Sequence, residues 1–183
     1  MEWDLPLSVN IDGIEHKIRN KCDYRVVLDC ISALNDNELT ESERIQCALF
    51  IFYENVDEIK DIEKACLEML KIINNGTDSD DSEDKPPLMD WEHDFKIIAP
   101  PVNRILNYDI RTPDKYTHWY TFLGAYMEIG ECLFSNVVSI RAKRAKGIPL
   151  DKTDRTFAEE NKKLIEIPIK LTAEEEAWLK ADI

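Results

Sequence analysis

One stretch of the chain, from Gly76 to Asp84, contains no large apolar residue and five acidic ones. A segment of this composition cannot bury enough surface to offset the entropy lost on folding. We therefore predict a solvated acidic linker over residues 75–87, between an N-terminal domain over 1–74 and a C-terminal domain over 88–183. With 183 residues, the chain is long enough to bury roughly 70% of its unfolded surface, without help from a disulfide or a metal.

The first half predicts a β-hairpin followed by three helices. Residues 7–11 and 14–18 alternate apolar and polar side chains on either side of Asp12-Gly13, a dipeptide suited to a type I′ turn. Behind the hairpin, apolar residues recur at the 3.6-residue spacing of amphipathic helices. The low glycine content, 5 residues in 183, argues against a turn-rich β architecture.

Polar residues indicate where these three helices begin. Asp23 is suited to cap the first helix, and Thr40 with Glu43 has the spacing of a capping box before the second. The third is expected to begin at Asp57. Because the second helix is apolar nearly all round, including Phe50, we expect it to lie at the centre of its bundle.

The second half is also predicted to be helical. Apolar residues keep helical register from Trp91 to Leu106, across Pro100-Pro101, but two prolines remove amide donors, so a break is expected there. Residues 116–129 are apolar on every side and predict a buried central helix. Further helices are expected from about Glu131 to Gly147, after Asp151 and from Thr172 to Leu179. The predicted fold class is mainly α: helical bundles with a short N-terminal β-hairpin.

The charge of the chain excludes several classes of partner. It carries 23 Lys and Arg against 37 Asp and Glu, a net charge of −14. This charge opposes binding to nucleic acids and to anionic membranes. We therefore expect no binding to nucleic acid or to a membrane. The N-terminus has no basic segment followed by an apolar one, as a secretory signal would, so we expect a cytoplasmic protein.

The sequence carries no pattern typical of an enzyme, a metal site or a cofactor site. Its five cysteines include no Cys-x-x-Cys pair and are expected to be buried and reduced, and its three histidines lack metal-ligand spacing. Glycine-rich phosphate loops and a Gly-x-Ser-x-Gly elbow are missing. His118 is expected to pack in the core or to bond an acidic neighbour. Glu128 and Glu131 are the acids whose burial would matter most for catalysis, although a helix-end role is commoner.

Two groups of residues are candidates for partner binding. The aromatic group occurs at helical spacing, where such side chains more often belong to the core. The basic group lies in the last turn of a predicted helix, where cations also complement the helix dipole. The candidates are Trp91, Phe95, Trp119 and Tyr120 in the aromatic group, and Arg141, Lys143 and Arg144 in the basic group.

Four stretches of the second half resemble one protein family. They are residues 90–95 (DWEHDF), 100–104 (PPVNR), 118–130 (HWYTFLGAYMEIG) and 139–147 (SIRAKRAKG). Together they resemble a family of small proteins from phages and prophages of Gram-positive bacteria, encoded among the tail genes near the tape measure gene. The resemblance extends from about Leu7 to Leu164.

The resemblance implies a tail assembly chaperone, a non-enzymatic protein that binds the tape measure protein and helps recruit tail tube subunits. Its expected partners are the tape measure protein and, beyond it, the tail tube protein and a second tail chaperone, all in the host cytoplasm. No cofactor is expected. Two alternatives stay open: a structural tail or adaptor component of the virion, and an acidic inhibitor of a host DNA-binding protein.

Overall fold

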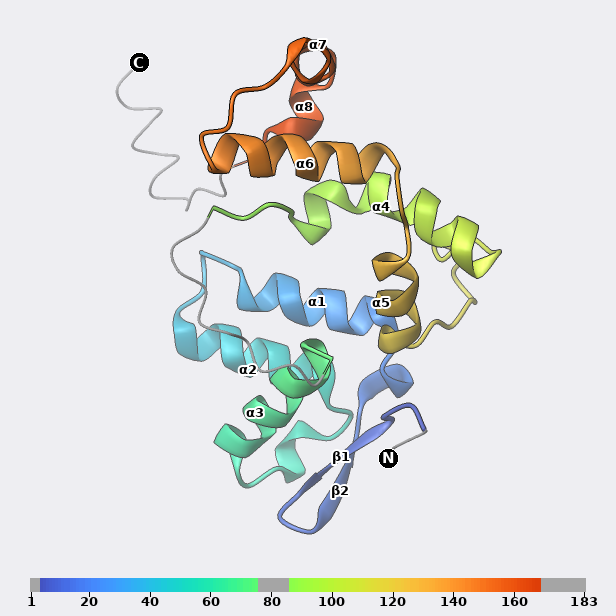
Figure 1. Cartoon of the computed structure of the whole chain (residues 1–183). Helices are drawn as coiled ribbons and strands as arrows, with labels where there is room; N and C mark the ends of the chain where they lie inside the picture. The colour runs from blue at the N-terminus through green and yellow to red at the C-terminus, as the bar shows by residue number, and fades with distance from the viewer. Residues whose placement is uncertain (1–3, 76–85, 169–183) are drawn as a thin grey trace. The chain divides into compact units, whose positions relative to one another are not determined.

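The computed structural model describes residues 4–75 and 86–168 and is mainly helical with an N-terminal β-hairpin, as predicted (Figure 1). These residues form two compact units, with a boundary inside a helix after Phe122. The first unit contains residues 4–75 together with 116–122. The second contains the remaining described residues. The sequence places residues 116–122 in the predicted C-terminal domain, but in the structure they pack with the N-terminal residues of the first unit.

The hairpin opens the first unit. Strands β1 (Ser8–Ile11) and β2 (Ile14–Lys17) pair antiparallel, with Val9 opposite His16. Asp12 and Gly13 between them both have positive φ, 53° and 84°, as a type I′ turn requires. The predicted hairpin and its turn are confirmed.

Two helices follow the hairpin and begin where their caps predict. Asp23 accepts a hydrogen bond from the Arg25 amide and caps α1 (Tyr24–Leu34). Thr40 and Glu43 form a complete capping box before α2 (Glu41–Phe52). Both caps satisfy amides that have no partner within the helix.

The third helix begins later than the sequence indicated. α3 spans Ile62–Ile73, and the Asp61 side chain caps it by accepting a hydrogen bond from the Lys64 amide. The preceding residues Val56–Glu58 form a separate 3₁₀ turn, so the expected start at Asp57 is wrong. This turn places a stretch of non-helical chain between α2 and α3.

Segment 116–122 adds aromatic side chains to the core of the first unit. The Tyr24 and Phe122 rings stack with their centroids 4.7 Å apart, and the Trp119 indole donates a hydrogen bond to the Ile73 carbonyl. The Thr117 amide donates to the Asp23 carboxylate at 3.0 Å. Asp23 therefore serves both the start of α1 and a segment 94 residues further along the chain.

The second unit contains five helical segments, one of which, α5, starts in the first unit. α6 ends before Gly147, whose φ of 66° suits the left-handed position after a helix, as predicted. The Asp151 side chain caps the helix that follows it. The segments are α4 (Trp91–Leu106), α5 (Trp119–Met127), α6 (Leu133–Ala145), α7 (Lys152–Glu160) and α8 (Lys162–Ile165).

The expected break at Pro100-Pro101 is wrong, because α4 continues through both prolines and bends along its length (Figure 1). A proline inside a helix costs about 3 kcal/mol. Ile98, before the prolines, and Val102, after them, are completely buried. Since fully burying each such side chain contributes roughly 1.5–3 kcal/mol, packing on both sides offsets a large part of the cost of the two prolines.

Three expectations about burial in the helices are also wrong. Helix α5 is not buried on every side, because Met127 is 65% exposed. Helix α2 is not central, because Phe50 is 64% exposed, and the neighbouring Cys47 is exposed although it was expected to be buried. Cys22 and Cys30 are buried as expected of a structural thiol. The predicted linker centre and the predicted helix 172–179 lie outside the described residues.

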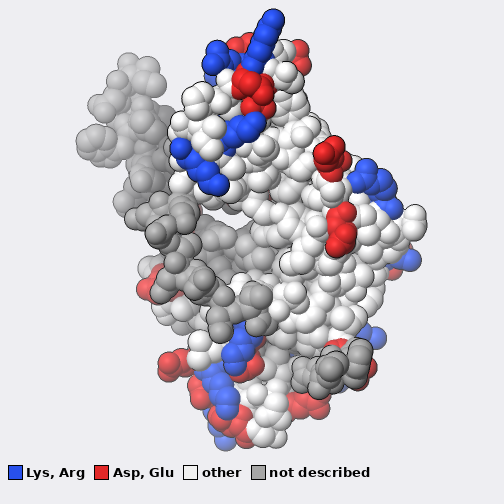
Figure 2. Space-filling view, in the orientation of Figure 1, with Lys and Arg blue, Asp and Glu red and all other residues white. Residues whose placement is uncertain are grey.

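The two units differ in charge. Residues 4–75 carry 15 Asp and Glu against 8 Lys and Arg, a net charge of −7, and residues 116–122 add none. Residues 86–168 carry 12 of each sign and are neutral. Figure 2 shows acidic and basic side chains side by side around α7 and the C-terminal end of α6. No helix within the described residues combines the length and the apolar composition that crossing a bilayer requires.

Candidate functional site

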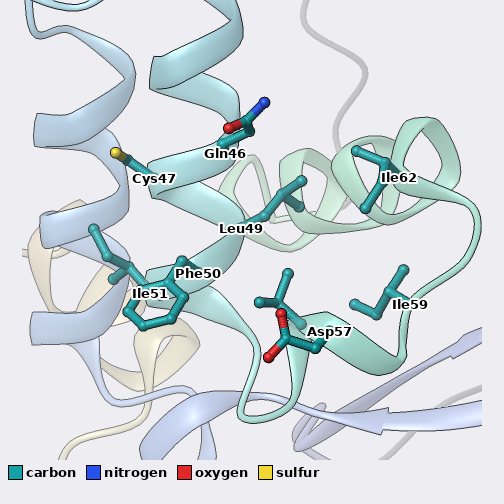
Figure 3. Close-up of a pocket in the computed structure, with 9 residues that line it drawn as sticks. Gln46, Cys47, Leu49, Phe50, Ile51, Asp57, Ile59 and Ile62 are labelled. Carbon is teal, nitrogen blue, oxygen red and sulfur yellow. The ribbon is translucent and has the colours of Figure 1, made fainter.

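The first unit carries an open apolar groove between α2 and the beginning of α3 (Figure 3). Its volume is about 640 Å³, within the usual range for ligand pockets. One side is formed by the C-terminal half of α2, and the other by the α2–α3 connection and the first residue of α3. We call this site the α2–α3 groove; its lining residues are Gln46, Cys47, Leu49, Phe50, Ile51, Val56, Asp57, Ile59 and Ile62.

Apolar side chains form both the interior and the rim of the α2–α3 groove. Leu49 and Ile59 are buried, whereas Ile62 is 44% exposed and Phe50 still more so. Covering a large apolar side chain completely contributes roughly 1.5–3 kcal/mol. Phe50 and Ile62 thus expose apolar surface beside an apolar hollow, which makes the groove a candidate binding surface.

Arg19, outside the helix, fixes the end of α2 that carries Phe50. Its guanidinium donates hydrogen bonds to the carbonyl oxygens of Phe50 and Tyr53, both at 2.8 Å, and its Nε donates to that of Ile51 at 2.9 Å. The same cation lies 5.6 Å from the centroid of the Phe50 ring. A cation at a helix C-terminus satisfies carbonyls that lack an intrahelical partner.

The opposite side of the α2–α3 groove is held by the packing of α3. The Tyr53 hydroxyl donates a hydrogen bond to the Ala65 carbonyl at 2.9 Å. Burial raises the pKa of Tyr53, so the phenol keeps its proton and remains a donor. The walls of the groove are therefore tied to backbone positions on both sides, which makes the groove preformed.

The polar groups of the α2–α3 groove are few. Asp57 is the one acidic residue in the lining, and within the described chain its carboxylate has no ion pair or hydrogen bond. Glu54 and Glu58 lie exposed on the same connection. The groove thus combines an apolar interior with a negative edge, an arrangement that suits the apolar face of a helix flanked by a positive charge.

The thiols of the first unit differ in exposure. Burial raises the pKa of Cys22 and of Cys30 to about 12, so both stay protonated. Cys47, in the α2–α3 groove, is exposed. Within residues 4–75 and 86–168, no group of three or more His, Cys, Asp or Glu side chains is placed to hold a metal ion.

The four aromatic candidates do not gather at this groove. Trp119 is buried in the first unit, and Tyr120 beside it is half-buried. In the second unit, Trp91 is half-buried against Tyr126, with ring centroids 5.0 Å apart, and Phe95 is also half-buried. Trp119 is therefore a core side chain, and the others contribute part of their surface to packing.

Arg141 is not available to a partner, because it is buried and fully engaged inside the second unit. Its guanidinium makes a two-bond ion pair with the Asp94 carboxylate, at 2.6 and 2.9 Å, and Asp94 itself is completely buried. It also donates hydrogen bonds to the carbonyl oxygens of Leu88, Leu164 and Ile165. One side chain thus joins α6 to α4, to the segment before α4 and to α8.

The other basic candidates and the candidate acid–base residues lie apart. Lys143 pairs with Asp154, and Arg144 is exposed. Glu128 and Glu131 are both exposed, so neither has the burial that made it a candidate. His118 is 2% exposed and packs in the core as expected.

The residues of the α2–α3 groove were missed by the sequence reasoning, although their signal was present. A helix that is apolar nearly all round was interpreted as central, whereas the same pattern also arises when one face serves the core and another a binding surface. The connection that supplies Val56 and Asp57 was expected to be part of a helix.

The fold and groove define a small, mainly helical protein with a preformed apolar surface on an acidic unit. The chain matches the family described as Bacteriophage Gp15 protein over residues 1–167, and it belongs to this family. The expected resemblance to a phage protein family is thereby confirmed, while the tail assembly role stays a prediction. No curated protein and no solved structure matches the chain.

Proposed function

We propose that this protein is a tail assembly chaperone that binds the tape measure protein of its phage. The observation that carries the proposal is the α2–α3 groove, a preformed apolar surface with an exposed Phe50, on a member of a bacteriophage family. A binding surface of this kind suits a protein that covers another chain.

The physical need for such a chaperone follows from the expected client. A tape measure protein is a long helical chain whose apolar segments aggregate unless they are covered before the tail tube encloses them. An amphipathic helix laid into an apolar groove is a common way to cover such segments reversibly. Ile62 is exposed and Ile51 and Val56 are half-buried, so these three offer the aliphatic surface that the apolar anchors of such a helix require.

The charge supports the same role. A net charge of −14 keeps a complex with an apolar client in solution and repels the phage DNA. Covering a helix requires burial of apolar surface alone, so the proposed activity involves no catalysis and no cofactor. In this proposal the protein works in the host cytoplasm, and the tail tube protein and a second tail chaperone join the same assembly.

The test is coexpression of this protein with overlapping fragments that span the tape measure protein of the same phage. We expect at least one fragment to be insoluble alone and to elute as a complex with the chaperone in size-exclusion chromatography. The Phe50→Ser variant should lose that complex while keeping its helical circular dichroism spectrum. If no fragment binds, the proposal is wrong.

Two further measurements separate the alternatives. Mass spectrometry of purified particles should find this protein absent; a stoichiometric amount would favour a structural virion component. A pull-down from host lysate should yield no DNA-binding protein; specific capture of one would favour the inhibitor.

A further inference from the structure

We infer that the α2–α3 groove selects amphipathic helices that carry a Lys or Arg beside their apolar anchors, and that Asp57 is the residue that recognises this cation. The inference rests on the proposed function and deepens it by naming the chemical class of the client segment. It makes Asp57 a specificity-determining residue, because the apolar lining alone does not distinguish one apolar helix from another.

Asp57 lies at the edge of the α2–α3 groove, where a bound client would reach it. Figure 3 shows Asp57 along the edge of the hollow, between Phe50 and Ile59 in this view. Asp57 is exposed, and within the described chain its carboxylate has neither an ion pair nor a hydrogen bond. A client lying across this edge displaces part of the water around this carboxylate.

The cost of that displacement decides which clients bind. A carboxylate that loses water without gaining a partner is strongly penalised, whereas a cation placed against it restores the lost interaction. A client with an acidic residue at this position adds like-charge repulsion. Asp57 thus favours helices with a basic residue at this position and disfavours helices with an apolar or acidic residue there. Specificity is commonly achieved by such a combination of attraction and rejection.

The surrounding charges favour the same kind of client. Glu54 and Glu58 are exposed on the same connection, and residues 4–75 carry a net charge of −7. The Arg19 cation, 5.6 Å from the centroid of the Phe50 ring, is committed to three carbonyl oxygens at the end of α2. Lys60 is exposed two residues beyond Glu58 and does not reverse the local excess of negative charge.

The dimensions of the α2–α3 groove favour a helix as the occupant. A hollow of about 640 Å³ holds a small number of aliphatic side chains from one face of a partner. A helix presents such anchors at positions i, i+3 and i+4, with a long basic side chain able to reach from the flank of the same face. The apolar stem of a Lys or Arg covers the rim while its charged head reaches Asp57.

The test uses the full chain and two designed fluorescent peptides, identical amphipathic helices with leucine anchors that differ in one flanking residue, Lys or Glu. We expect the Lys peptide to bind at least tenfold more tightly than the Glu peptide by fluorescence anisotropy at low salt. The Asp57→Lys variant should reverse this preference, and Asp57→Asn should reduce it below threefold. The matched control Glu159→Lys makes the same change of charge on α7 and should leave the preference unchanged.

The outcomes separate this inference from the proposed function. If tape measure fragments bind but Asp57→Lys changes neither their affinity nor the peptide preference, the inference is wrong and the chaperone proposal stands. If the peptide preference reverses as expected while no tape measure fragment binds, the client class is right and the chaperone proposal fails. Self-association of the chain that Phe50→Ser abolishes would show that a second copy occupies the groove, and would overturn the inference.

Discussion

The two units bury their apolar helices in different ways. In the first unit, α2 leaves Phe50 exposed beside an open hollow, and the unit carries a net charge of −7. In the second, the Arg141–Asp94 ion pair and three further hydrogen bonds from Arg141 close the interior, and the charges balance. The first unit thus leaves apolar surface open at one place, whereas the second pairs its buried Arg141 and Asp94 with each other.

This difference indicates that a binding surface is to be sought in the first unit. A buried ion pair gives little net stability compared with apolar packing, but removing one partner is expensive because the other charge stays buried. Arg141 therefore constrains the second unit rather than serving a partner. The first unit keeps Phe50 and Ile62 of the α2–α3 groove in water, and this is the surface that the proposed client would cover.

The largest expected effect on the free energy of unfolding comes from breaking the buried Arg141–Asp94 ion pair. Arg141→Met leaves the completely buried Asp94 without its cation, and we expect the free energy of unfolding to fall by about 3–5 kcal/mol. Urea denaturation monitored by circular dichroism measures the loss. Lys143→Met is the matched control on the same helix, since the Lys143–Asp154 pair is partly exposed and should contribute less than about 1 kcal/mol. Equal losses in the two variants would mean that the buried pair constrains the second unit no more than a partly exposed pair does.

Phe50 and Phe52, two residues apart on α2, allow a direct comparison of an exposed and a buried side chain within the first unit. Phe52 is completely buried, and Phe52→Ala should destabilise the protein by about 3–5 kcal/mol. Phe50→Ala removes an exposed ring and its contact with Arg19, at a cost below about 1 kcal/mol. The same denaturation experiment checks both. A large loss at Phe50 would mean that this ring belongs to the core and not to a binding surface.

A smaller effect on stability is expected when the pH falls, because of His118 in the first unit. Burial lowers the pKa of His118, and its ring is satisfied in the neutral form: Nε2 lies 3.0 Å from the Pro6 carbonyl oxygen, and Nδ1 accepts the Tyr120 amide hydrogen. Below the ordinary histidine pKa of about 6.5, the unfolded chain therefore binds a proton that the folded chain excludes. Stability is lost as the pH falls from 7 towards 5, by at most about 1.4 kcal/mol per pH unit for this group.

The measurement is the pH dependence of unfolding in the wild type and in His118→Gln. The variant should show a shallower fall in stability between pH 7 and pH 5, because its side chain does not titrate. A steeper or identical dependence would mean that His118 is not held neutral in the folded protein.

Local signals predicted much of the fold. The Asp12-Gly13 turn, the Asp23 cap and the Thr40–Glu43 capping box all depend on residues close together in the sequence, and all are confirmed. The wrong expectations depended on tertiary packing. The continuity of α4 through Pro100-Pro101 follows from burial on both sides of the prolines, which their sequence alone does not reveal.

The candidate site was less predictable. The sequence identified Arg141 as a cation but not the buried Asp94 partner 47 residues earlier, so an internal ion pair was interpreted as a surface feature. Periodicity showed that α2 is apolar, but not which of its faces lacks a neighbour, because that depends on how α3 packs. Asp57 becomes notable only after the 3₁₀ turn places it beside that face.

The most direct test of the central claim, that the α2–α3 groove receives the client, is hydrogen–deuterium exchange of the full chain with and without a bound tape measure fragment. We predict slower exchange confined to peptides covering residues 46–62, with no change in α6. Slower exchange in α6 or α7, with residues 46–62 unaffected in a saturated complex, would contradict the account.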